Sequence, residues 1–110
     1  MKIGCDIVEI ARIERALTRT KGFPNFLTKA EREIFDTMKG KRRAEWLAGR
    51  FAAKEAVIKA MHGIRELTLL EVEILRDEKG APICSIPEVE VTIAHENAYA
   101  IAFAAIQESK

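Results

Sequence analysis

Four side chains have the types and positions that metal-assisted or proton-transfer chemistry needs: Asp6, Glu55, Lys59 and His95. Glu55 and Lys59 are four residues apart, which places them one turn apart on the same side of a helix. A carboxylate such as Glu55 can bind a divalent metal ion, and a lysine ammonium can bind a phosphate or transfer a proton. With Asp6 from a different element, Glu55 could hold Mg²⁺, which favours a few carboxylates together with phosphate oxygens and water.

Each of these residues also has an ordinary structural role open to it. A Glu–Lys pair at this spacing stabilises many helices by about 0.3–0.5 kcal/mol. Asp6 comes at the end of a short apolar segment and just before a predicted helix, where an aspartate is commonly an N-cap. A histidine in a turn, as expected for His95, is commonly solvated or hydrogen-bonded. The residues alone leave these alternatives open.

The two cysteines, Cys5 and Cys84, indicate neither a disulfide framework nor a zinc site. They lie far apart in apolar runs, and neither has a partner at zinc-ligand spacing. Both are therefore predicted to be reduced.

The elements that must position the chemical residues follow from the spacing of the apolar side chains. A helical period predicts helices over residues 8–19, 29–38 and about 43–62. A period of two predicts strands over residues 2–7, 70–76, 82–86, 89–94 and 99–106, with a hairpin turn at 77–80 and a tight connection at 95–98. Thr28 with Glu31 forms a capping-box pattern, and Gly40 and Gly63 are expected to end the second and third helices.

This order predicts one α+β domain over residues 1–110, with helices first and then a small, mostly antiparallel sheet. The helix over 43–62 has apolar residues around a wide arc, so we expect it to be mostly buried against the sheet. Arg50 and Lys54 lie within or beside that arc. Buried charges are costly unless they are paired or bind an ion.

Charge is distributed unevenly along a chain whose net charge is only +1. Residues 1–65 carry 15 basic and 8 acidic side chains, a net charge of +7, whereas residues 66–110 carry 3 and 9, a net charge of −6. A local positive field attracts anions, so we expect an anionic partner for the first half. Nucleic acid, an acidic protein and a phosphorylated cofactor all fit this charge.

The chain of 110 residues contains no apolar run of the roughly 18 residues that a membrane-spanning helix needs. Its first residues, MKIGCD, lack the basic-then-apolar layout of a secretion signal. The expected location is the cytoplasm, with no membrane partner.

Three blocks of residues carry a resemblance to a known family: GCDIVEIARI at 4–13, LAGRFAAKEAVIKA at 47–60, and VTIAH at 91–95 followed by YAIA at 99–102. In this order they resemble the holo-(acyl-carrier-protein) synthase family of 4′-phosphopantetheinyl transferases. LTKAE at 27–31 also fits the family pattern. The resemblance spans essentially the whole chain, and the middle block is its most specific part.

The resemblance implies transfer of the phosphopantetheine arm of coenzyme A to a serine of apo-acyl carrier protein, releasing adenosine 3′,5′-bisphosphate, in fatty-acid biosynthesis. It implies that Asp6 and Glu55 hold Mg²⁺ against the diphosphate of coenzyme A. Lys59 would bind that diphosphate or assist proton transfer, so Glu55 and Lys59 are the expected catalytic residues. Arg50 and His95 would lie on the nucleotide side.

The resemblance also implies two protein contacts. Arg12, Arg15 and Arg19 on the first helix would face the acidic carrier protein. Members of this type are commonly homotrimers with active sites between neighbouring subunits. The sequence differs from the family pattern in a shorter segment after the long helix, in Ala94 before the histidine and in Cys5 at an aliphatic position.

Two other functions are compatible with parts of the sequence. The basic run of Lys39, Lys41, Arg42 and Arg43 could belong to a small nucleic-acid-binding module, although no aromatic platform for stacking bases accompanies it. A non-catalytic subunit that binds coenzyme A or carrier protein is the second alternative. The presence of both carboxylates and of Lys59 argues against it.

Overall fold

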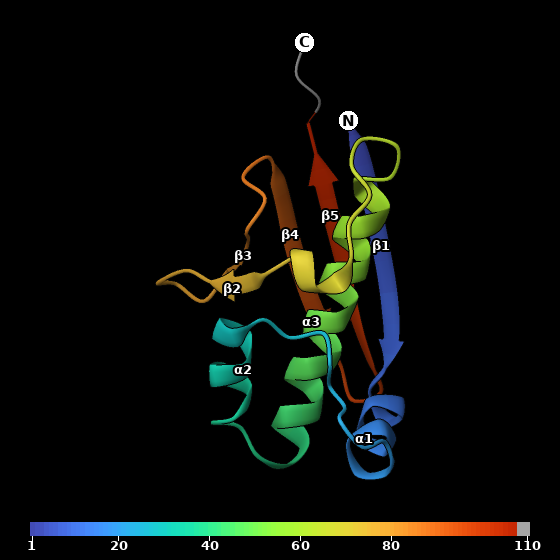
Figure 1. Cartoon of the computed structure of the whole chain (residues 1–110), viewed down its shortest axis with the longest axis vertical. Helices are drawn as coiled ribbons and strands as arrows, with labels where there is room; N and C mark the ends of the chain where they lie inside the picture. The colour runs from blue at the N-terminus through green and yellow to red at the C-terminus, as the bar shows by residue number, and fades with distance from the viewer. Residues whose placement is uncertain (108–110) are drawn as a thin grey trace.

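The computed structural model describes residues 1–107. In this part of the chain the helices are α1 (Ile10–Arg19), α2 (Lys29–Phe35), α3 (Gly40–Ala60) and the short 3₁₀-helix η1 (Leu69–Glu71). The strands are β1 (Lys2–Glu9), β2 (Ile74–Arg76), β3 (Pro82–Cys84), β4 (Val89–His95) and β5 (Tyr99–Ile106). The predicted α+β class is confirmed, with β1 preceding all the helices (Figure 1).

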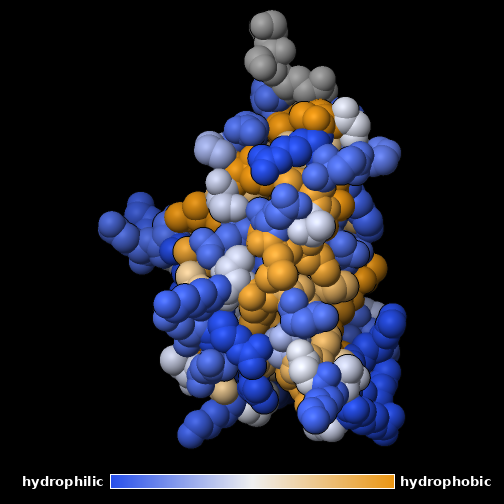
Figure 2. Space-filling view, viewed as in Figure 1, coloured by the Kyte–Doolittle hydropathy of each residue, from blue (hydrophilic) through white to orange (hydrophobic). Residues whose placement is uncertain are grey.

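The strands form two antiparallel sheets. β5 lies between β1 and β4 in a three-stranded sheet, and β2 and β3 form a separate two-stranded ribbon. Figure 1 shows α3 running along one face of the three-stranded sheet, with α1 at the end of β1 and α2 beside the first turns of α3. From the same side, hydrophilic side chains cover α1 and α2 while apolar ones reach the surface over the middle of the molecule (Figure 2). Within residues 1–107 no helix combines the length and the apolar character needed to cross a membrane.

Close contact between α3 and the sheet is made by small residues on both sides. The contacting side chains are at most 1% exposed: Ala48, Ala52, Ala56, Ala60, Ala100, Ala102 and Ala104. At Gly4 of β1 the two backbones come closest, because a Cβ placed there would lie 2.0 Å from the Ala56 carbonyl oxygen and 2.7 Å from the Ala60 nitrogen. Only glycine fits at this point of the strand.

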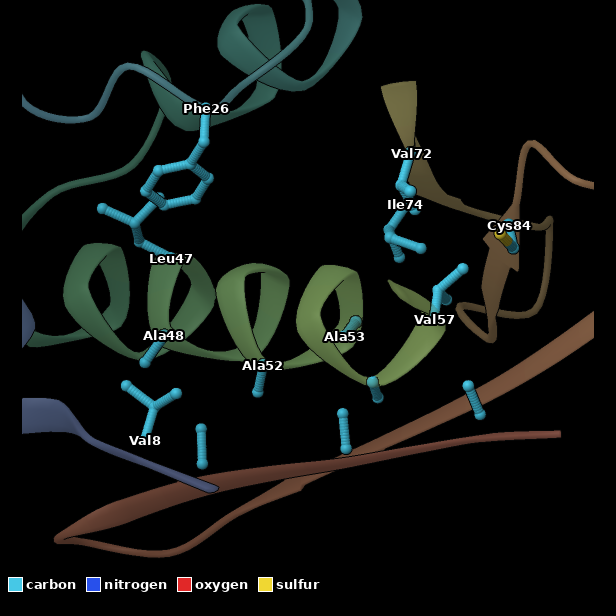
Figure 3. Close-up of a cluster of buried hydrophobic side chains, with 14 of the residues drawn as sticks. Val8, Phe26, Leu47, Ala48, Ala52, Ala53, Val57, Val72, Ile74 and Cys84 are labelled. Atoms are coloured by element: carbon cyan, nitrogen blue, oxygen red, sulfur yellow. The ribbon is translucent and has the colours of Figure 1, made fainter. Parts of the chain in front are cut away.

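The opposite side of α3 is covered as well. Figure 3 shows Ala48 and Ala52 pointing toward the strands, whereas Leu47 points toward Phe26. Val57 meets a cluster formed by Val72, which follows η1, and by Ile74 and Cys84 of the β2–β3 ribbon (Figure 3). The predicted burial of the long helix is thus confirmed, and it arises from enclosure on two sides.

Several predicted element bounds are correct. The capping box is present, since the Thr28 hydroxyl accepts from the Glu31 N–H and the Glu31 carboxylate accepts from the Thr28 N–H. The turn at 77–80 is closed by Asp77, whose Oδ1 accepts from the N–H groups of Lys79 and Ala81, each at 2.9 Å. β5 spans residues 99–106 as predicted, and both cysteines are free.

Other bounds were wrong at the ends of helices. β1 continues to Glu9, so α1 begins at residue 10 rather than 8. The second helix ends at Phe35, and residues 36–38 continue as hydrogen-bonded turns instead of helix. Gly40 does not end that helix, because its φ of 61° lets the chain turn sharply at the first residue of α3. At its far end α3 stops at Ala60, two residues earlier than predicted.

The segment predicted as one strand over 70–76 is divided. Thr68 and Glu71 form a second capping box, which starts η1 and delays β2 until Ile74. β3 ends at Cys84 rather than residue 86, and β4 extends one residue further than predicted, through His95. The two-residue period correctly predicted strands in this part of the chain, but it did not reveal the Thr68–Glu71 capping box.

Gly4→Ala is predicted to destabilise the fold by at least about 2 kcal/mol, because the new methyl would overlap the backbone of α3, which cannot rotate away. Gly49→Ala is the matched control. Its Cβ would meet only the Ile93 Cγ2 atom at 3.1 Å, and a side chain can adjust. Urea unfolding followed by circular dichroism measures both variants, and equal unfolding midpoints for Gly4→Ala and wild type would contradict the close contact.

Candidate active site

Asp6 and Lys59 form an ion pair between β1 and α3. The Lys59 Nζ donates to Asp6 Oδ1 at 3.0 Å and to the Cys5 carbonyl oxygen at 3.0 Å. The Asp6 side chain is 18% exposed and that of Lys59 is 53% exposed, so the ammonium remains open to an incoming anion. The hydrogen bond to Asp6 raises the pKa of Lys59, and the negative charge of Glu55 adds to this effect. Lys59 is therefore a stable positive charge at neutral pH.

The ion pair bears on two structural roles that the sequence left open, Asp6 as an N-cap and Lys59 as the partner of Glu55 on the helix. Asp6 is not an N-cap, because β1 runs three residues beyond it and Glu9 occupies the capping position of α1. Even-numbered residues of β1 face α3, which turns the Asp6 carboxylate toward the helix. Lys59 pairs with this strand residue, so its role extends beyond a helical pair with Glu55.

Asp6 and Glu55 line one pocket of about 360 Å³ between α1, β1 and α3. We call it the carboxylate pocket; its lining includes Asp6, Arg12, Phe23, Phe51 and Glu55. The lining of this pocket therefore combines two carboxylates, a guanidinium and two aromatic rings. Two carboxylates of separate elements are the hard oxygen donors that Mg²⁺ takes when phosphate and water complete its shell.

Arg50 and His95 meet in a second pocket, of about 190 Å³. We call it the basic pocket; its lining includes Arg42, Trp46, Arg50, Ile93 and His95. His95 is the last residue of β4 and is exposed, so it does not lie in the turn in which it was expected. The Arg50 guanidinium stacks over the Trp46 ring, with its Cζ 4.7 Å from the ring centroid.

Buried donors of the basic pocket lack partners. Arg50 is 8% exposed, and within residues 1–107 neither its Nε nor the Nε1 of Trp46 has a hydrogen-bond acceptor. Burial lowers the pKa of Arg50 to about 10, while the charge of Glu31 acts in the opposite direction. The guanidinium is still charged at neutral pH, and its buried Nε, which lacks an acceptor, favours binding of an anion.

The three arginines of α1 are all exposed. Arg12 lines the carboxylate pocket, and Arg15 lies 3.8 Å from Glu9. Arg19 is in the last turn of the helix. The three side chains thus lie along α1, with Arg12 at the carboxylate pocket.

Comparison with known proteins decides the family. The sequence pattern of the 4′-phosphopantetheinyl transferase superfamily matches residues 2–104. The chain belongs to this superfamily. It is 42% identical to the holo-[acyl-carrier-protein] synthase of Bacillus cytotoxicus over 91% of this chain and 89% of that protein. It is 41% identical to the synthase of Bacillus cereus over 97% and 95%.

Solved structures of the superfamily agree. A holo-(acyl-carrier-protein) synthase from Bacillus anthracis in complex with CoA (3′,5′-ADP) superposes with a TM-score of 0.87 at 40% identity, covering 98% of this chain and 96% of that one. A Helicobacter pylori synthase in complex with coenzyme A gives 0.79 at 32% identity, covering 96% and 99%. The predicted family, fold and enzyme class are confirmed.

The sequence did not predict an ion pair between two buried residues beside the site, Lys54 and Glu31. Lys54 immediately precedes Glu55, and its Nζ lies 2.7 Å from Glu31 Oε1, with both side chains fully buried. Burial lowers the pKa of Lys54, and the hydrogen bond that its ammonium donates to Glu31 opposes this effect. The available signal was the position of Lys54 in the apolar arc of the long helix. Glu31 gave no such signal, because the capping box already accounted for it.

Asp6→Asn is predicted to lower the pKa of Lys59 toward that of an ordinary lysine, because it removes the carboxylate that stabilises the ammonium. Since the folded pKa is raised, the pair stabilises the fold at neutral pH, and this contribution is lost as the pH rises through the folded pKa of Lys59. Titration of the lysine side-chain signals by NMR measures the shift. Glu66→Gln, near His62, is the control and should leave Lys59 unchanged; an unaltered Lys59 pKa in Asp6→Asn would mean that the ion pair is absent in solution.

Proposed function

We propose that this protein is a holo-[acyl-carrier-protein] synthase that moves 4′-phosphopantetheine from coenzyme A to a serine of apo-acyl carrier protein. The observation that carries the proposal is the meeting of Asp6, Glu55 and Lys59, from β1 and α3, in a chain 42% identical to a protein of that name. The solved relatives that hold coenzyme A support the same substrate. We further propose that residues 1–110 act as one domain, in the cytoplasm, and supply fatty-acid biosynthesis.

Asp6 and Glu55 would hold Mg²⁺, and the donor set fits that ion. Mg²⁺ is usually bound through one or two carboxylates, with phosphate oxygens and water as the remaining ligands, and the carboxylate pocket offers two. When bound, the ion supplies positive charge that neutralises the diphosphate and stabilises the departing nucleotide phosphate.

The protein's own side chains bind and orient the substrates. Lys59, protonated and half-exposed, binds an oxygen of the diphosphate while Asp6 fixes its ammonium. Arg50 and His95 bind the nucleotide end in the basic pocket. The serine oxygen then bonds to the phosphorus that carries pantetheine while its proton passes to the Glu55 carboxylate. The bond from that phosphorus to the bridging oxygen breaks, and adenosine 3′,5′-bisphosphate leaves with that oxygen. Glu55 and Lys59 are the proposed catalytic residues.

Carrier protein would dock on α1. Arg12, Arg15 and Arg19 form a row of exposed positive charge that starts at the carboxylate pocket. Figure 2 shows strongly hydrophilic side chains over α1, at the lower right of the view. An acidic carrier would be drawn to this helix and its serine brought to the pocket.

The outer face of the three-stranded sheet supports a homotrimer. Large apolar side chains on it are between 45% and 65% exposed: Ile3, Ile7, Tyr99 and Phe103. An apolar area of this kind marks an interaction surface. Because β4 carries His95 at its end, a neighbouring subunit packed on this sheet would approach the basic pocket and place the active site between subunits.

A nucleic-acid-binding module is not favoured. Arg43 lies over the Phe35 ring, 4.3 Å from its centroid, and Arg42 belongs to the basic pocket. The basic run therefore serves folding and a small pocket more than an extended strand of phosphates.

With Mg²⁺, coenzyme A and apo-carrier, the purified protein is expected to yield a carrier heavier by one phosphopantetheine in mass spectrometry. Glu55→Gln should retain the fold and lose at least about 100-fold in rate, because it removes a charged ligand from a site that works by charge neutralisation. The control is Glu33→Gln, which makes the same carboxylate-to-amide change at an exposed position of α2 and should be fully active. No mass gain by the wild type with a folded carrier would refute the proposed function.

Phe103→Glu is predicted to convert the assembly to monomers, since it places a charge at the middle of the apolar sheet face. Light scattering on a sizing column should give three chain masses for the wild type and one for the variant. Leu70→Glu changes an apolar residue of η1 that is also about half-exposed, and this variant should remain trimeric. A wild type that elutes as one chain would remove the trimer from the proposal.

A further inference from the structure

Lys54 is the most completely satisfied charged group in the interior described here. Its side chain is fully buried, and its Nζ donates to Glu31 Oε1 at 2.7 Å, to the Phe26 carbonyl at 2.7 Å and to the Leu69 carbonyl at 3.0 Å. An ammonium has three donors, so every one of them has an acceptor. Two of these acceptors are backbone carbonyls of segments outside α3.

Glu31 extends the network in two further directions. Its Oε1 also accepts from the Thr28 N–H at 2.9 Å, and its Oε2 accepts from the Ile74 N–H at 2.6 Å. The pair therefore connects α3 to the start of α2, to η1 and to β2. A buried ion pair is no more stabilising than well-packed apolar residues of the same volume, so its distinct effect here is to fix the backbones that it bonds.

The backbone that it fixes most directly leads to the carboxylate pocket. Residue 26 is held through its carbonyl, and its ring packs edge-on against Phe23, with centroids 5.8 Å apart, and against Phe51, 5.2 Å apart. Phe23 and Phe51 form the aromatic side of the carboxylate pocket, which also contains Glu55. Arg32 holds the same segment from α2 by donating to the Pro24 carbonyl at 3.1 Å.

We propose that the buried Lys54–Glu31 pair positions the aromatic side of the carboxylate pocket for the protein substrate, so that Lys54 is a positioning residue. The inference rests on the proposed function. The basic pocket is lined by the other side of α3 and by β4, without any residue of the segment 23–28. The carboxylate pocket adjoins α1, where the carrier would dock. In the carboxylate pocket coenzyme A is proposed to be held through Asp6, Glu55 and Lys59, and none of these side chains hydrogen-bonds to the pair. Loss of the pair should therefore weaken use of the carrier and leave use of coenzyme A nearly unchanged.

The test is the double variant E31Q/K54M, compared with each single variant and with wild type. Either single change leaves an unpaired buried charge and lowers thermal stability, whereas the double variant removes both charges and should recover much of the loss. It still leaves the carbonyls of residues 26 and 69 without their donor. K29M/E33Q, which changes the same residue types at exposed positions of α2, is the matched control.

For the double variant we expect the KM for apo-carrier to rise at least five-fold while the KM for coenzyme A stays within two-fold of wild type. Amide hydrogen exchange of residues 22–28 should be at least ten-fold faster, with β5 unchanged. Arg15→Glu, which alters the proposed docking helix itself, provides the reference for a lost carrier contact. A merely structural role predicts no such split between the two KM values.

A carrier KM within two-fold of wild type in the folded double variant overturns the proposal, as does a parallel rise of both KM values. If the wild type shows no transfer, the proposed function fails. The hydrogen-exchange comparison then still tests whether the Lys54–Glu31 pair holds the segment 22–28. Unchanged exchange of these residues in the double variant would show that the pair does not hold it.

Discussion

The contact between α3 and the sheet sets the position of everything else in this protein. At Gly4 the backbone of β1 is so close to that of α3 that a single methyl would overlap the Ala56 carbonyl. At this separation a lysine on the edge of the helix reaches across to the strand, and Lys59 does so with two hydrogen bonds of 3.0 Å. A larger residue in place of Gly4 would push the helix outward and separate Lys59 from Asp6. The small residues of the interface are therefore a condition for the chemistry as well as for the packing.

A rigid helix also fixes the spacing of the two pockets. Arg50 and Glu55 are five residues apart on α3, which corresponds to about 7.5 Å along the axis. The first lines the basic pocket and the second the carboxylate pocket, on different sides of the helix. A cofactor with phosphates at both ends of a nucleotide could occupy both pockets at once. Because α3 is enclosed by the sheet and by the Val72–Ile74 cluster, it cannot shift to change that spacing.

The sequence predicted the structure best where the residue types and the spacing of apolar side chains indicated the same element. The long helix followed from apolar spacing. The four chemical residues were identified by residue type and by their place in the expected elements, although each also had an ordinary structural role open to it. Asp6 was predicted at the end of its strand, but it lies within β1, which continues to Glu9. The prediction was wrong because the alternation along β1 overlaps the helical pattern that starts at Val8. The residue types at the end of a strand also do not differ from those in its middle. The Glu31–Lys54 pair joins residues 23 positions apart through the tertiary fold, so no local pattern could predict it.

Lys54 and Lys59 show why the motif alone is ambiguous. They are the same residue type, five positions apart on one helix. Burial lowers the pKa of Lys54, whose ammonium donates to three protein oxygens. The neighbouring Asp6 raises the pKa of Lys59, which remains half-exposed. One lysine uses its charge to hold three segments of backbone, and the other keeps its charge at the surface for a phosphate. The difference comes from which side of α3 each faces: Lys54 toward η1 and the segment before α2, Lys59 toward the edge of β1.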